Sequence, residues 1–107
     1  MLKRAAHPGV ILKEELAETG VTLTELARQI DVPANRMSQI INGKRAVTGD
    51  TALRLARWFD TSPQFWMNLQ ALYDVRLAEQ HAGAEIRNLP TRPVASGTDH
   101  PRPVDRS

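Results

Sequence analysis

The chain has 107 residues, enough for one compact domain, with 41% hydrophobic residues to build a core and a formal net charge of only +2, which neither favours nor excludes a nucleic-acid partner. It contains no cysteine, which excludes disulfides and thiolate metal sites, and its three histidines (His7, His81 and His100) have no metal-ligand spacing. No segment approaches the roughly 18 apolar residues that indicate a membrane span, and no secretory signal is visible, so a soluble, cytoplasmic protein without membrane contact is expected.

The first predicted helix lies between Pro8 and Gly20. Proline is common in the first turn of a helix, and glycine is common just after the last turn. Leu12 and Leu16 are four residues apart and share one face, while charged residues occupy the other side. The pattern predicts an amphipathic helix of about three turns.

A second helix is predicted to begin after Thr22 and to end before Pro33. Thr22 and Glu25 have the spacing of a capping box, in which each side chain satisfies a backbone N–H of the other residue. Leu26 and Ile30 then supply an apolar face. The helix is short because the residue before a proline is disfavoured in helical geometry.

The third predicted helix, over residues 34–42, is apolar on one side and rich in amides on the other. Asn35, Gln39 and Asn42 recur at helical spacing on the polar side. Every charged residue between positions 32 and 48 is basic. A local basic face of this kind can bind phosphate even when the whole chain is close to neutral.

Two further helices complete the predicted domain. Thr48 is positioned to cap the fourth helix, and Ser62 followed by Pro63 is a strong start signal for the fifth. Beyond the fifth helix the apolar periodicity ends, and four of the seven prolines occur there. Residues 1–80 are therefore expected to form an all-α, five-helix domain, and residues 81–107 a Pro-rich, disordered tail.

The second and third helices, joined by a tight turn, are typical of a helix-turn-helix. In that motif the N-terminal part of the second helix of the pair enters the major groove of DNA. Asn35 and Gln39 can each address adenine, and Arg36 can pair with guanine. Helix N-termini, hydroxyl groups and loop cations can contact the phosphates. The candidate phosphate contacts are Thr22, Thr24, Ser38, Lys44 and Arg45.

Other interpretations of the same pattern are open. An ordinary five-helix domain with a solvated polar face has the same spacing, although the lack of acidic residues on the third helix favours DNA binding. An enzyme is not expected, because no nucleophile–base set, phosphate loop or ligand cluster is present, and no cofactor is implied. RNA binding has weak support, since the polar face has no aromatic platform.

The fifth predicted helix carries more apolar surface than the core of one domain needs. Trp66 and Leu69 are expected to close that core. Leu72, Tyr73 and Leu77 lie beyond the reach of the other helices, so they are expected to form a homodimer interface. Two copies on a two-fold axis would place their third helices about 34 Å apart, which is one turn of a DNA duplex.

Much of the chain resembles a known family. The stretch VTLTELARQIDVPANRMSQIINGKRAVTGDTALRLARWFDTSPQFWMNLQ resembles the lambda-repressor-type (Xre) helix-turn-helix and, more narrowly, the HigA antitoxins of bacterial toxin–antitoxin modules. With the preceding HPGVILKEEL, the resemblance covers about residues 7–79. NGKRAVT and FWMNLQ are fairly specific together, whereas a helix-turn-helix alone is not.

This resemblance implies a lambda-repressor-like fold and a dimeric antitoxin. Such a protein binds a double-stranded operator in its own promoter, acts as an autorepressor, and neutralises a HigB-type ribonuclease toxin. The resemblance maps the base contacts to Ala34, Asn35, Arg36 and Gln39, and phosphate contacts to Thr24, Lys44 and Arg45.

Two departures from the family pattern affect these expectations. Asp31 stands in the turn where the family often has glycine, but aspartate tolerates left-handed geometry, so the turn is expected to be kept. Ala34 is short and is expected to touch a thymine methyl group rather than to form a hydrogen bond.

The toxin-binding surface is not identified by the sequence. The acidic first helix, with Glu14, Glu15 and Glu18, is a candidate because a toxin that holds RNA is expected to be basic, and an ordinary solvated face explains these residues equally well. The alternative function is a stand-alone Xre-type transcriptional regulator without a toxin partner.

Overall fold

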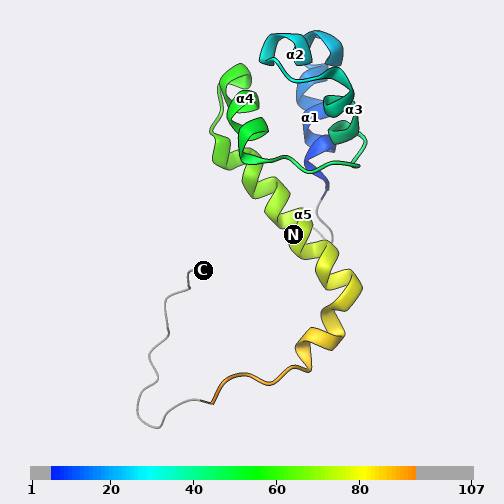
Figure 1. Cartoon of the computed structure of the whole chain (residues 1–107), viewed down its shortest axis with the longest axis vertical. Helices are drawn as coiled ribbons and strands as arrows, with labels where there is room; N and C mark the ends of the chain where they lie inside the picture. Colours follow the sequence, from blue (N-terminus) through cyan, green and yellow to red (C-terminus); the bar gives the residue numbers. More distant parts are fainter. Residues whose placement is uncertain (1–5, 94–107) are drawn as a thin grey trace.

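The computed structural model describes residues 6–93, which form five helices and no strand (Figure 1). The helices are α1 (Pro8–Ala17), α2 (Leu23–Ile30), α3 (Ala34–Ile41), α4 (Gly49–Phe59) and α5 (Pro63–Arg87). Figure 1 shows α1 to α4 gathered in one body, while the long α5 starts beside α4, passes beneath that body and continues beyond it. The expected all-α, five-helix architecture is confirmed, and within residues 6–93 no helix is both long and apolar enough to cross a membrane.

The predicted helix starts are also confirmed. The side-chain oxygens of Thr22, Thr48 and Ser62 each accept a hydrogen bond from the backbone N–H three residues later. These caps satisfy N–H groups that have no partner within the helix, so short polar residues determine where the helices begin.

The core lies where α1, α2, α3 and α4 meet the first turns of α5. Its largest fully buried side chains include Trp66, which closes the core as predicted; Leu69, also expected there, is half-buried against it. α1 crosses the C-terminal end of α3 at Gly9, where a Cβ atom would lie only 2.1 Å from the carbonyl oxygen of Ile40. Only glycine allows the two backbones to approach so closely. The large hydrophobic side chains that are fully buried in the core are Leu12, Leu26, Met37, Ile40, Leu55 and Trp66.

α5 is longer than predicted. It does not end near residue 80: a kink at the non-helical Ala82 (φ −139°, ψ 15°) lies next to the predicted end, and a second helical stretch continues beyond it to Arg87. The expectation of disorder from residue 81 is therefore wrong for residues 81–87, while its part over residues 94–107 lies outside the described residues. The reason is that backbone hydrogen bonds need no apolar face, and the alanine, glutamate and glutamine residues near this end favour a helix by themselves.

Candidate nucleic-acid interface

α3 has one side in the core and one side in solvent. Met37 and Ile40 have no exposed surface, whereas Asn35 and Gln39 are exposed. Because successive apolar residues three and four apart hold one face against α1 and α2, the amide-bearing face points outward. Among the other residues predicted to contact bases, Ala34 is exposed and Arg36 is half-buried.

The turn between α2 and α3 has the expected geometry. Asp31 adopts a left-handed conformation (φ 60°, ψ 49°), so aspartate replaces glycine there without loss of the turn. The backbone N–H of Val32 donates to the carbonyl of Ala27 at 3.0 Å, which closes the end of α2. The turn leaves only three residues between the end of α2 at Ile30 and the start of α3 at Ala34, as a helix-turn-helix requires.

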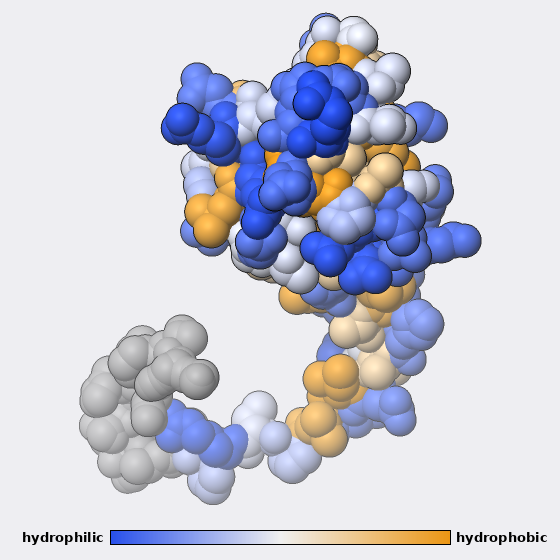
Figure 2. Space-filling model, turned by 45° about the horizontal axis from the view of Figure 1, so that its top comes forward, coloured by the Kyte–Doolittle hydropathy of each residue, from blue (hydrophilic) through white to orange (hydrophobic). Residues whose placement is uncertain are grey.

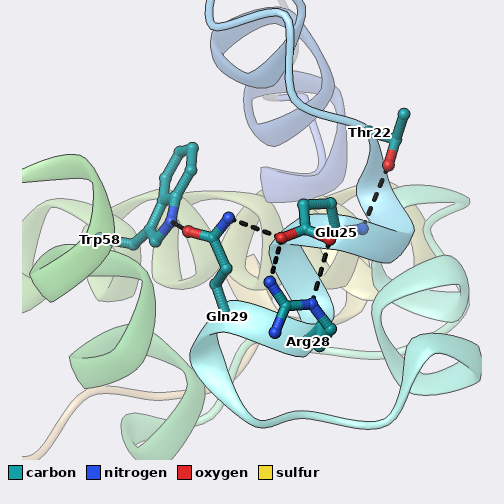
Figure 3. Close-up of polar contacts among 5 residues, drawn as sticks. All are labelled: Thr22, Glu25, Arg28, Gln29 and Trp58. Carbon is teal, nitrogen blue, oxygen red and sulfur yellow. Dashed lines mark hydrogen bonds and ion pairs between the residues drawn. The ribbon is translucent and has the colours of Figure 1, made fainter.

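A chain of polar contacts ties the N-terminal part of α2 to α4 (Figure 3). Glu25 donates its backbone N–H to Thr22 Oγ1 at 3.1 Å, as the capping box predicts. The Glu25 carboxylate does not take the expected return role but accepts hydrogen bonds from Arg28 and from Gln29 Nε2. Gln29 Oε1 in turn accepts a hydrogen bond from Trp58 Nε1 at 2.7 Å. These hydrogen bonds, first from Arg28 and then from Gln29, lower the pKa of Glu25 to about 2.

The Thr22 hydroxyl remains able to act as predicted. Its oxygen accepts the capping hydrogen bond, which leaves the hydroxyl hydrogen available as a donor to a phosphate. Thr24 is exposed on the first turn of α2, and Ser38 is half-buried on α3. Lys44 and Arg45 are both exposed in the loop that follows α3.

The loop between α3 and α4 is bound to α3 and to α5. The backbone N–H of Lys44 donates to the Gln39 carbonyl at 2.8 Å, and Arg45 Nε donates to Gln39 Oε1, also at 2.8 Å. Further along the loop, the backbone N–H of Val47 donates to Gln70 Oε1 of α5 at 2.8 Å. The structure therefore brings a predicted base contact, Gln39, together with a predicted phosphate contact, Arg45.

His7 contacts the first turn of α1, Tyr73 of α5 and Gly43 of this loop. Its Nδ1 accepts a hydrogen bond from the Gly9 backbone N–H at 2.9 Å, and its ring meets the ring of Tyr73 edge-on, with centroids 4.9 Å apart. Burial lowers the pKa of His7, and the nearby Asp74 carboxylate and a hydrogen bond with the Arg45 backbone oppose that shift in part. Tyr73 is accordingly half-buried against its own chain.

Sequence reasoning missed the residues that hold this surface in place. Arg54 lies on α4 and donates to the carbonyl of Ile30 across the turn, a contact between residues 24 positions apart that no sequence pattern indicates. The sequence does contain an indication of Gln70, because this polar residue lies at helical spacing from Trp66 and Tyr73 on an otherwise apolar face. A polar residue in such a position is expected to satisfy a buried partner.

Beyond the core, α5 exposes apolar side chains. Figure 2 shows apolar residues along the arm that α5 forms outside the four-helix body. Leu72 is 57% exposed and Leu77 is 38% exposed, so both predicted interface leucines are free of the core. Val75, which was not predicted, is 58% exposed and lines a shallow groove with Leu72.

Comparisons with known proteins agree with this geometry. A helix-turn-helix family model matches residues 12–66. Virulence-associated protein I of Dichelobacter nodosus is 44% identical over 77 residues, which cover 71% of each chain. The structure of an addiction module antidote protein of the HigA family from Coxiella burnetii superposes with a TM-score of 0.79 and 44% identity, covering 83% of this chain and 98% of that one.

A structure with DNA is also similar. The Pseudomonas aeruginosa antitoxin HigA with the higBA promoter has a TM-score of 0.78 and 40% identity, covering 81% of this chain and 97% of that chain. The resemblance to HigA antitoxins is thereby confirmed over most of the chain. On its sequence match and on the fold described above, the chain belongs to the helix-turn-helix family.

Proposed function

We propose that this protein is a sequence-specific DNA-binding autorepressor and the antitoxin of a toxin–antitoxin module. The observation that carries the proposal is the orientation of α3, with Met37 and Ile40 buried and Asn35 and Gln39 exposed. The similarity to an antitoxin HigA with its promoter supports the same assignment. The proposal gives the chain no catalytic role and needs no cofactor.

In this proposal α3 enters the major groove. Ala34, Asn35, Arg36 and Gln39 address base edges, with the two amides suited to adenine and the guanidinium to guanine. The hydroxyls of α2 and α3 and the loop cations contact phosphates and set the register of the domain on the duplex. These phosphate contacts are Thr22, Thr24, Ser38, Lys44 and Arg45.

Binding to DNA is tested with two single variants. Gln39→Ala is expected to weaken binding to the preferred duplex by roughly 1–3 kcal/mol and to relax specificity at one base pair. Lys44→Ala is expected to weaken binding to every duplex and to reduce the slope of log K against log salt by about one unit. Fluorescence anisotropy on a duplex from the chain's own upstream region and on a scrambled duplex measures both effects. Equal losses on the two duplexes for both variants would contradict the proposal.

We also propose that the protein acts as a homodimer through α5. Leu72 and Leu77 are exposed and apolar, and Tyr73 keeps part of its surface outside its contact with His7. A dimer would cover these side chains and would present two copies of α3 to successive turns of the duplex. Light scattering of the wild type and of Leu72→Glu tests this: a monomeric wild type at micromolar concentration that still binds an operator tightly would refute it.

The partner in the antitoxin role is proposed to be a HigB-type ribonuclease. Glu14 and Glu15 on α1 and Glu18 at its C-cap are exposed, and their charge suits a basic toxin. Co-expression with the product of an adjacent small basic gene tests the role: rescue of growth and co-purification are expected. If neither occurs while DNA binding persists, the chain is a stand-alone Xre-type regulator.

A further inference from the structure

Gln39 is held at both its backbone and its side chain by the two residues after Gly43. Its carbonyl oxygen accepts a hydrogen bond from the Lys44 backbone N–H, and its side-chain Oε1 accepts one from Arg45 Nε, each at 2.8 Å. Both Gln39 and Arg45 are exposed, so this contact lies on the surface that would face DNA and not within the core.

The chemistry of this contact determines which way the Gln39 amide points. A guanidinium has only donors, so the amide oxygen must face Arg45 and the amide nitrogen must point elsewhere. The nitrogen keeps its two donors, and the oxygen keeps one lone pair. One amide N–H and the free lone pair of the oxygen therefore lie side by side in a fixed order. Adenine complements this order, because its N7 accepts a hydrogen bond and its N6 amino group donates one.

Arg45 is itself anchored to the rest of the domain. The loop packs on the ring of His7, the N-cap of α1, which would lie 3.8 Å from a Cβ at Gly43, and two residues after Arg45 the Val47 backbone N–H is bound by Gln70 of α5, which is 5% exposed. The loop also leaves α3 through Gly43, whose φ of +77° turns the chain back along the helix. The position from which Arg45 reaches Gln39 is therefore determined by α1 and α5.

We propose that Arg45 is a positioning residue for Gln39 and thereby contributes to base specificity, beyond a contact with phosphate. The proposal rests on the DNA-binding function proposed above. A glutamine free to rotate can adapt its donor and acceptor to several base edges, whereas a glutamine with an oriented amide discriminates between them. Because the Gln39 side chain is already ordered before DNA binds, DNA binding also loses less side-chain entropy.

The test uses duplexes selected by the wild type from a pool randomised over about 20 base pairs, two helical turns. Binding of the selected duplex and of its single-base-pair variants is then measured for five proteins. These are the wild type, Gln39→Ala, Arg45→Ala, the double variant, and Lys44→Ala as a matched control that removes the neighbouring exposed cation.

The base pair addressed by Gln39 is the one where Gln39→Ala loses discrimination. At that pair Arg45→Ala is expected to lower discrimination by about two- to twelvefold, the range for immobilising one side chain. Adding Arg45→Ala to Gln39→Ala is expected to change discrimination there no further. Lys44→Ala is expected to weaken all duplexes by one common factor.

Two results have different meanings. If Arg45→Ala weakens every duplex equally and keeps wild-type discrimination at the Gln39 base pair, Arg45 is only a phosphate contact and the inference is overturned. If the wild type selects no sequence from the pool, the proposed DNA-binding function fails instead. Circular dichroism of each variant confirms that the exposed substitutions leave the helices intact.

Discussion

Arg54 of α4 donates a hydrogen bond from Nη1 to the carbonyl oxygen of Ile30 at 2.9 Å, and so caps the C-terminal end of α2 from another helix. The same guanidinium donates from Nε to Asp50 at 2.9 Å. A cation at a helix C-terminus is favourable because the last carbonyl groups have no partner within the helix. The contact connects α4 to the turn on which the placement of α3 depends.

Replacement of Arg54 tests how much this cap contributes to the fold. Arg54→Leu is expected to unfold at a lower denaturant concentration than the wild type, since the Ile30 carbonyl loses its partner and Asp50 its counterion. Arg57→Leu, an equivalent change at an exposed position one turn later, serves as the control and is expected to have little effect. Equal midpoints for the two variants would show that the cap does not stabilise the turn.

Gly9→Ala is expected to destabilise the fold by about 1–3 kcal/mol, as overpacking does in a tight contact. The new methyl group would lie 2.1 Å from the Ile40 carbonyl oxygen, and backbone atoms cannot move aside as the end of a side chain can. Gly49→Ala is the matched control, because nothing lies within 4 Å of a Cβ at that position. Alanine normally favours a helix over glycine, so chemical denaturation is expected to give a lower free energy of unfolding for Gly9→Ala than for Gly49→Ala.

Gln70→Ala is expected to lower the free energy of unfolding by about 1–3 kcal/mol, the cost of leaving a buried donor without a partner. Gln70 Oε1 accepts the Val47 backbone N–H, and Gln70 Nε2 donates to Asp74 Oδ1 at 2.9 Å, so one side chain joins the loop to α5. Gln80→Ala, at an exposed position on the same helix, provides the control. Comparable denaturation midpoints for the two alanine variants would argue against a structural role for the buried amide.

The stability of the protein is expected to fall as the pH decreases below about 6.5. Burial lowers the pKa of His7, so in that range the unfolded chain binds a proton that the folded chain does not. Stability therefore rises with pH until the unfolded histidine is neutral, and it falls as the pH decreases through the folded pKa. Protonation would also remove the Nδ1 lone pair that accepts the Gly9 N–H.

His7→Asn separates titration from capping, because asparagine is a good N-cap residue that does not titrate. Denaturation of this variant between pH 7 and pH 5 is expected to show a weaker dependence on pH than the wild type. The exposed His81, changed to asparagine, is the control and is expected to keep the wild-type dependence. An unchanged pH dependence in His7→Asn would exclude His7 as the source.

The amino-acid sequence by itself determined the helices and the orientation of α3. Local rules were sufficient, because Thr22, Thr48 and Ser62 act on N–H groups three residues away and a 3.6-residue period places Met37 and Ile40 on one face. The end of α5 was not predicted, because the helical backbone continues to Arg87 after the apolar stripe has stopped. Beyond that point only the backbone hydrogen bonds show where the helix ends.

Only the tertiary structure decided how the candidate interface is held in place. Arg54 with Ile30 and Gln70 with Val47 join residues more than 20 positions apart, and the pairing depends on how the helices cross. Arg45 is only six residues from Gln39, yet its direction follows from a loop that packs on His7 at the start of α1 and is hydrogen-bonded to Gln70 of α5. Sequence spacing describes neighbours along one element, whereas these contacts arise between elements, where distance in the chain gives no measure of distance in space.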